Sequence, residues 1–155
     1  QLQSSAASDV YKRQAQFNIL MATIHLQGGA EMIEAAKSAA GNTKILGVSL
    51  LTSLDENDTS ELYGNSFDDQ FTKLITLAKS SSVDGIVCSP KELISLHDLS
   101  KIKVVPGIRN TQTNDDQKRT MTSQEAYAQG ADYIVVGRPI TQANNIAAAI
   151  EEYLV

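Results

Sequence analysis

A strand-like stretch near the C-terminus has the sequence Tyr133-Ile134-Val135-Val136-Gly137-Arg138-Pro139-Ile140. Its β-branched and aromatic residues stop at a glycine, which predicts a buried strand ending where the backbone must approach another group closely. The arginine after the glycine suggests that this group is an anion. The stretch Val104-Val105-Pro106-Gly107-Ile108-Arg109 has the same form of apolar strand, glycine and arginine. We therefore expect two strand ends that together form a phosphate site.

The composition is that of an ordinary globular domain. The chain has 155 residues, of which 42% are hydrophobic and 20% are charged. No apolar run reaches the roughly 20 residues of a membrane span, and no signal peptide opens the chain, so a cytoplasmic location is expected. The net charge of −5 argues against a nucleic-acid surface. Neither a membrane nor a nucleic acid is therefore expected as a partner.

Cysteine and histidine usage predicts neither a disulfide framework nor a metal site. The single cysteine, Cys88, ends an apolar run and is expected to be a buried small hydrophobe rather than a nucleophile. The two histidines, His25 and His97, do not form a metal-ligand pattern with it.

Strand-like and helix-like segments alternate along the chain from Asn18 onward. Two capping boxes, Ser89-Pro90-Lys91-Glu92 and Thr122-Ser123-Gln124-Glu125, mark helix starts. A short helical turn is expected within 55–66, and an apolar stripe is expected on the last helix at Ala143, Ile146, Ala147, Ile150 and Leu154. The expected strands are 18–25, 44–51, 84–88, 102–106 and 132–136, and the expected helices include 31–40 and 67–78.

Five consecutive βα units with near-continuous apolar strands predict an α/β fold with a parallel sheet. The strands begin roughly 28 residues apart, so eight such units would need about 225 residues, close to a (β/α)8 TIM barrel. A phosphate site after the last two strands of such a barrel would account for both Gly-Arg stretches. The chain would then supply the last five units of an incomplete barrel. A five-stranded open flavodoxin-like sheet is the alternative.

The two arginines have two interpretations each. Gly137 would leave room for backbone N–H groups to face a ligand, and a helix beginning near Thr141 would add its positive end beside Arg138. Alternatively, Arg138 caps the rim of the fold and pairs with a carboxylate, and Arg109 presents the same choice. The polar loop 110–121 is either solvated surface or a functional loop.

Other candidate residues follow the first two strands. His25 could be a catalytic acid or base, but a structural histidine is favoured because no nearby carboxylate is placed to orient it. Thr52 and Ser53 could bind a ligand or cap the segment that follows. The run Asp55–Asp58 is expected to be a solvated face.

Five blocks of the sequence resemble the orotidine 5′-monophosphate decarboxylase family, in its bacterial form. They occur in family order over residues 16–155, and their combination is more specific than any one block. The blocks are Ile24-His25-Leu26-Gln27-Gly28-Gly29, Leu50-Leu51-Thr52-Ser53-Leu54-Asp55, Asp84-Gly85-Ile86-Val87-Cys88-Ser89-Pro90, Val105-Pro106-Gly107-Ile108-Arg109 with Asp116-Gln117-Lys118-Arg119, and Asp132-Tyr133-Ile134-Val135-Val136-Gly137-Arg138-Pro139-Ile140-Thr141.

The resemblance implies a homodimeric (β/α)8 barrel that converts orotidine monophosphate to UMP and CO2 without a cofactor or metal. It implies that Arg109 contacts the substrate phosphate, that Gln117 closes over it on a mobile loop, and that Gly137 and Arg138 complete the site. Thr52 would contact the nucleotide near its base. His25 matches a family position that is not the proton donor, which agrees with a structural role at the active-site face.

One departure from the family pattern is decisive for activity. The family carries its catalytic aspartates and lysines around an Asp-x-Lys-x-x-Asp block, which this sequence does not contain. We therefore expect no catalytic residue and no activity in the isolated chain.

Residues 1–14 are expected to be a tail foreign to the family, and 15–155 the C-terminal portion of the barrel domain. The alternatives are a non-catalytic nucleotide- or phosphate-binding α/β module and another phosphate-substrate barrel decarboxylase of the same superfamily.

Overall fold

The computed structural model describes residue 13 and residues 17–110 and 120–154. The chain divides into two compact units. The first comprises the chain up to Ser49 together with Asp55–Val87, and the second comprises Leu50–Leu54 together with the chain from Cys88 onward. The expected N-terminal tail, apart from Arg13, lies outside the described residues.

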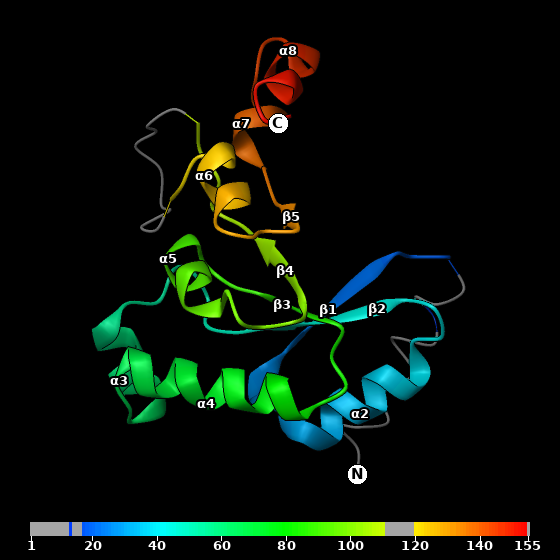
Figure 1. The fold of residues 1–155 in the computed structure, drawn as a ribbon, viewed down its shortest axis with the longest axis vertical. Helices are drawn as coiled ribbons and strands as arrows, with labels where there is room; N and C mark the ends of the chain where they lie inside the picture. The colour runs from blue at the N-terminus through cyan, green and yellow to red at the C-terminus, as the bar shows by residue number, and fades with distance from the viewer. Residues whose placement is uncertain (1–12, 14–16, 111–119, 155) are drawn as a thin grey trace. The chain divides into compact units, whose positions relative to one another are not determined.

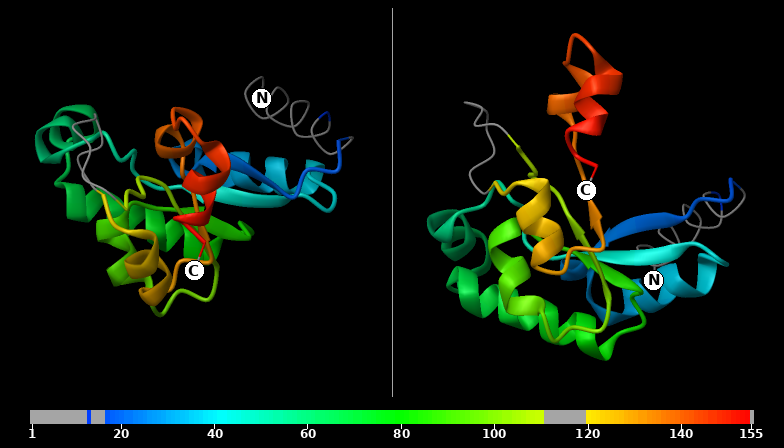
Figure 2. Two further views of the ribbon diagram at one scale, coloured as in Figure 1. Left: turned by 90° about the horizontal axis from the view of Figure 1, so that it is seen from above. Right: turned by 45° about the horizontal axis from the view of Figure 1, so that its top comes forward.

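The first unit is a parallel sheet covered by helices. Its strands are β1 (Met21–His25), β2 (Lys44–Val48) and β3 (Gly85–Val87), and they pair in chain order. In the register of the sheet, Met21 lies opposite Lys44 and Leu46 opposite Gly85. The helical segments are η1 (Leu26–Gly28), α2 (Gly29–Ala39), α3 (Glu56–Tyr63) and α4 (Phe67–Ser80), of which α2 and α4 lie along the same face of the sheet (Figures 1 and 2).

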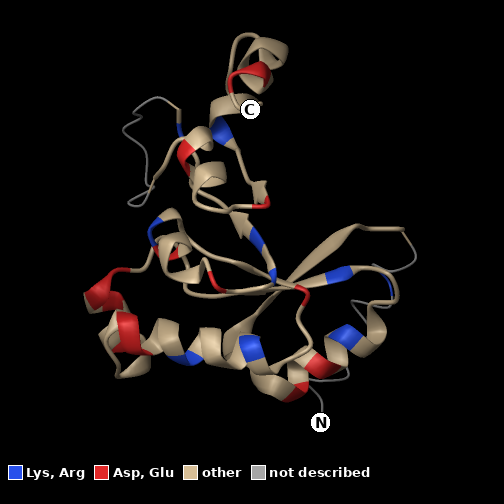
Figure 3. Cartoon of the chain, viewed as in Figure 1, with Lys and Arg blue, Asp and Glu red and all other residues tan. Residues whose placement is uncertain are grey.

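The apolar pattern of these elements explains their packing. β2 is buried along its centre, as expected for a strand with both faces covered. Helix α4 buries Leu74, Ile75 and Ala78 from its predicted apolar stripe, while Phe67 and Phe71 stack on each other with ring centroids 6.5 Å apart. The segment 55–66 forms a full helix, α3, because the Asp55 carboxylate accepts the N–H groups of Asn57 and Asp58 at its start. Acidic side chains gather on this helix (Figure 3).

The second unit contains β4 (Ile102–Val105) and β5 (Tyr133–Ile134), which pair in parallel with Val104 opposite Tyr133. Both predicted capping boxes are confirmed: the Glu92 carboxylate accepts the Ser89 N–H at 2.9 Å, and the Glu125 carboxylate accepts the Thr122 N–H at 3.0 Å. The helical segments are α5 (Pro90–Leu93), η2 (Ile94–Leu96), α6 (Ser123–Ala128), α7 (Arg138–Thr141) and α8 (Ile146–Glu151).

Two expectations for this unit were wrong. The predicted buried strand 132–136 is a two-residue strand, with Tyr133 44% and Val135 48% exposed. The described residues do not cover these side chains, and β5 pairs with β4 along one edge and with no described strand on its other edge. The last segment is also not a single helix with one continuous apolar stripe, and Ile146, Ile150 and Leu154 are exposed. That segment is split into α7 and α8, and the second unit buries Ala149 and Tyr153 instead.

Parallel strands alternate with helices throughout both units, so the predicted α/β class is confirmed. Because the strands within each unit run in the same direction, the residues that follow β4 and β5 lie at one edge of their sheet. Those residues include Arg109, Gly137 and Arg138.

Candidate phosphate-binding site

The second unit contains four of the five residues expected to bind substrate, namely Thr52, Arg109, Gly137 and Arg138. Arg109 lies four residues beyond β4, and Arg138 lies four residues beyond β5. Since Val105 and Ile134 are partners in the parallel register, both arginines leave the sheet at the same end of neighbouring strands. The fifth residue, Gln117, lies outside the described residues.

Arg109 is held in a nearly enclosed position. Its peptide N–H donates to the carbonyl oxygen of Met121 at 2.9 Å, next to a parallel bridge between Ile108 and Met121. The residue is 8% exposed, and its Nη1 donates to the carbonyl oxygen of Ile108 at 2.8 Å. A guanidinium shielded from water in this way binds an anion more strongly than an exposed one, because less solvent screens the charge.

Gly107 and Gly137, the glycines of the two Gly-Arg stretches, differ in backbone conformation. Gly107 has a φ of 79°, in the left-handed region that favours glycine, so the local backbone explains it. Gly137 has a φ of −99°, and a Cβ atom built on it would meet no atom of its described surroundings within 4 Å. Its ψ of −102° places the residue outside the helical and extended regions, and packing against the described residues does not account for Gly137.

Arg138 is the first residue of α7 and is half-buried. The carbonyl oxygen of Gly137 accepts the N–H groups of Ile140 and Thr141, each at 3.0 Å, which fixes the turn at the end of the strand. The helix thus begins three residues earlier than the expected start near Thr141, and it is only four residues long. Its dipole is correspondingly weak, so the charge of Arg138 rather than the helix end would hold an anion.

Thr52 lies in a tight turn that follows β2. The N–H of Leu54 donates to the carbonyl oxygen of Leu51 at 3.1 Å and closes the turn. Thr52 is half-buried, while Leu50 before it is 2% exposed and anchors the segment. This arrangement leaves Thr52 at the surface of its unit, as a ligand contact requires.

His25 is the last residue of β1 and is exposed. Its assignment as a structural residue at the active-site face stays a prediction.

Cys88 is 1% exposed, which confirms its expected burial. Burial, and secondarily the nearby Glu92, raises the pKa of the Cys88 thiol to about 12, so the thiol stays protonated and unreactive at neutral pH.

The described residues hold no group of three or more His, Cys, Asp or Glu side chains that could bind a metal ion. None of the described helices combines the length and apolar character of a membrane span. Among the described residues, the candidate site consists of Arg109, Arg138, Gly137 and the hydroxyl group of Thr52.

Comparison with known proteins shows which family shares these features. Residues 5–153 match the model of the orotidine 5′-phosphate decarboxylase / HUMPS family. The chain belongs to this family. It is 41% identical over 148 residues to an orotidine 5′-phosphate decarboxylase of Neisseria meningitidis, a match that covers 89% of this chain and 60% of that protein. It is 44% identical over 128 residues to one of Erythrobacter litoralis, covering 79% of this chain and 57% of that protein.

The fold agrees with the family assignment. The crystal structure of orotidine 5′-phosphate decarboxylase from Lactobacillus acidophilus matches with a TM-score of 0.80 and 32% identity, covering 97% of this chain and 70% of that one. The expected fold class, five βα units of the family's barrel, is therefore confirmed. The chain spans about 60% of the length of the curated relatives that it matches.

Proposed function

We propose that this chain forms the phosphate-binding part of an orotidine 5′-phosphate decarboxylase, which converts orotidine monophosphate to UMP and CO2. The relatives at 41% and 44% identity carry this name, which supports the proposal. Arg109 and Arg138 would bind the substrate phosphate from two neighbouring strand ends. Gln117 would close over the phosphate, and Thr52 would contact the nucleotide near its base.

The observation that carries the proposal is the open space beside Gly137. No described side chain or backbone atom lies within 4 Å of the place of its missing Cβ. A phosphate oxygen that approaches the backbone beside Arg138 would explain why a side chain is absent there. An arginine–phosphate contact contributes about 1.5–3 kcal/mol as a charge-assisted hydrogen bond.

The bond-breaking step requires groups that these residues do not supply. The bond from C6 to the carboxylate breaks, CO2 leaves, and C6 takes a proton. In the family, the lysine of the Asp-x-Lys-x-x-Asp block donates that proton, and the carboxylates destabilise the departing group. The 155 residues lack this block, so we propose that they bind substrate phosphate but do not decarboxylate by themselves. The proposal also includes a homodimer in the cytoplasm. Of the expected foreign tail, 1–14, only residues 1–4 lie outside the family match.

An assay of the purified chain with orotidine monophosphate tests the catalytic half of the proposal. We expect no UMP and no CO2 above the uncatalysed background, because no residue of the chain can protonate C6 in the family manner. Turnover that increases with protein concentration would contradict the proposal.

A titration followed by 1H–15N NMR tests the binding half. Inorganic phosphate and UMP should shift the amide signals of Arg109 and Arg138, with dissociation constants on the order of millimolar. The substitutions Arg138→Ala and Gly137→Ala should weaken both shifts, whereas Lys91→Ala, which removes an exposed charge on α5, should not. Phosphate shifts that do not involve Arg109 and Arg138 would refute the assignment. Tight UMP binding without the missing block would instead favour a non-catalytic nucleotide-binding module.

A further inference from the structure

Asn110, the residue directly after Arg109, makes three hydrogen bonds within the second unit. Its side-chain Oδ1 accepts the N–H of Ser123 at 2.9 Å, and its Nδ2 donates to the carbonyl oxygen of Glu152 at 2.5 Å. Its own peptide N–H donates to the hydroxyl group of Tyr153 at 3.3 Å. Both polar atoms of the side chain are therefore engaged, and its orientation is fixed.

The partners of Asn110 are firmly placed. Ser123 is the first residue of α6 and is 1% exposed, and Tyr153 is 6% exposed. Glu152 caps the C-terminal end of α8, where helix carbonyl groups lack partners within the helix. Asn110 thus joins the start of α6 to the end of α8. An asparagine is suited to this role because it both donates and accepts, which neither an aspartate nor an apolar residue can do.

The first consequence concerns Arg109. Its N–H donates to the carbonyl oxygen of Met121, and the N–H of the next residue, Asn110, donates to the hydroxyl group of Tyr153. The backbone around Arg109 is therefore fixed from both directions. A cation that is held in place before the ligand arrives loses less conformational entropy on binding.

The second consequence concerns Arg138. The segment that begins at Arg138 runs through α7 and α8 to Glu152, where Nδ2 of Asn110 holds it. The strand end that carries Arg109 and the helical segment that starts with Arg138 are thus joined through one side chain. We propose that Asn110 is the positioning residue of the two-arginine phosphate site, an inference that rests on the proposed function.

Sequence analysis placed Asn110 only at the start of a polar loop. Its role depends on bonds to residues 13, 42 and 43 positions away, which no local pattern indicates. The small polar pocket of about 250 Å³ that Asn110 lines with Thr122, Ser123, Gln124, Glu152 and Leu154 marks the same junction.

The test compares phosphate affinity with stability in the full 155-residue chain. Asn110→Ala and the similarly sized Asn110→Leu should weaken the binding of inorganic phosphate about tenfold in an NMR titration, which corresponds to about 1.4 kcal/mol. The Arg109 amide should exchange with solvent at least several-fold faster. Tyr153→Phe removes only the acceptor of the Asn110 N–H and should have a smaller effect on both measurements.

Asn65→Ala is the matched control. Asn65 makes three hydrogen bonds through its side chain, to Tyr63, Gln70 and Lys73, where the Asn110 side chain makes two, but Asn65 lies in the first unit. It should lower the melting temperature while leaving phosphate affinity unchanged. Asn110 variants that behave like Asn65→Ala would overturn the inference and leave the proposed function intact. If Arg109→Ala does not weaken phosphate binding, the proposed site and this inference both fail.

Discussion

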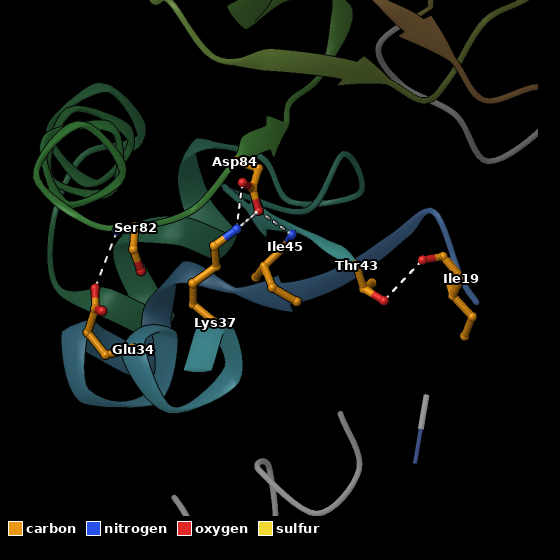
Figure 4. Close-up of polar contacts among 7 residues, drawn as sticks. All are labelled: Ile19, Glu34, Lys37, Thr43, Ile45, Ser82 and Asp84. Atoms are coloured by element: carbon orange, nitrogen blue, oxygen red, sulfur yellow. Dashed lines mark hydrogen bonds and ion pairs between the residues drawn. The ribbon is translucent and has the colours of Figure 1, made fainter. Parts of the chain in front are cut away.

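Asp84 and Ile45 are joined by two hydrogen bonds that run in opposite directions. The N–H of Asp84 donates to the carbonyl oxygen of Ile45 at 2.8 Å. In the opposite direction, the N–H of Ile45 donates to the Asp84 carboxylate at 2.7 Å (Figure 4). The carboxylate also forms an ion pair with Lys37 of α2 at 2.5 Å. Asp84 therefore fixes the start of β3 to β2 and to the helix that covers them.

The second unit repeats this arrangement. Asp132 precedes β5, its N–H donates to the carbonyl oxygen of Lys103 at 2.9 Å, and its carboxylate accepts the N–H of Lys103 at 2.8 Å. An aspartate just before a strand thus binds the preceding strand of the same sheet in two separate βα units. In both cases it sets the register of a short strand.

Replacement of these aspartates should destabilise the chain unequally. Asp84→Ala removes an ion pair and an acceptor for a strand N–H and should cost about 2 kcal/mol of the free energy of unfolding. Asp132→Ala removes one such acceptor at an exposed site and should cost about 1 kcal/mol. Urea unfolding measures both. The control Asp98→Ala, at a side chain that is 87% exposed, should change stability by less than about 0.5 kcal/mol. Equal effects of the three substitutions would contradict this assignment.

Gly47→Ala should destabilise the first unit by overpacking. A Cβ on Gly47 would lie 2.4 Å from Cδ2 and 2.8 Å from Cγ of Leu26, which is fully buried and has little room to move. We expect a loss of about 1–3 kcal/mol in the free energy of unfolding. Leu26→Ala alone should also destabilise, but the double variant should lose less than the sum, because the new methyl group fills part of the cavity. Strict additivity would show that the two sites do not interact.

The start of α6 should loosen in acid. Hydrogen bonds from the backbone N–H and then the hydroxyl group of Thr122 hold the pKa of the exposed Glu125 carboxyl below its ordinary value. A lowered folded-state pKa contributes stability that is present above the unfolded pKa and is lost as pH falls through the folded pKa. Amide exchange at α6 should therefore speed up over that range, beyond the intrinsic pH dependence of exchange. Glu125→Gln should reduce this pH dependence, and an unchanged profile would exclude the capping carboxylate as its cause.

The exposed edge at β5 should promote self-association. Val135 is 48% exposed beside a strand that pairs on one edge only among the described residues. Unpaired strand edges with apolar side chains attract other strands, and a lysine there opposes such pairing. Val135→Lys should therefore shift the chain toward monomer in sedimentation velocity, whereas Tyr127→Lys, on α6, should not. A wild-type chain that is strictly monomeric would contradict the prediction.

The sequence predicted the order and type of the elements, because each depends on local signals. The capping boxes at Ser89 and Thr122 and the apolar face of α4 were recognised from residues close together in the chain. The exposed β5 and the split between α7 and α8 were not, because burial depends on what covers a segment. The pattern of Tyr133–Val136 is that of a covered strand, but the described residues do not cover it.

The same division holds for the candidate site. Arg109 and Arg138 were predicted from glycine–arginine pairs that follow apolar strands. Asn110 was not, since its partners Ser123, Glu152 and Tyr153 come from distant positions that only the fold brings to it. The difference between Gly107 and Gly137 also required the structure, because Gly107 has a positive φ whereas the Cβ position of Gly137 is open space.

The burial of Cys88 makes the chain suitable for labelling at a chosen position. The chain has one cysteine, and its thiol, with a pKa of about 12, will not compete with an exposed thiol for a maleimide dye. A cysteine introduced at the exposed Gln142, just after α7, would carry the only fluorophore. Such a chain would report phosphate binding near Arg138 by a change in emission, without the removal of any native residue from the core.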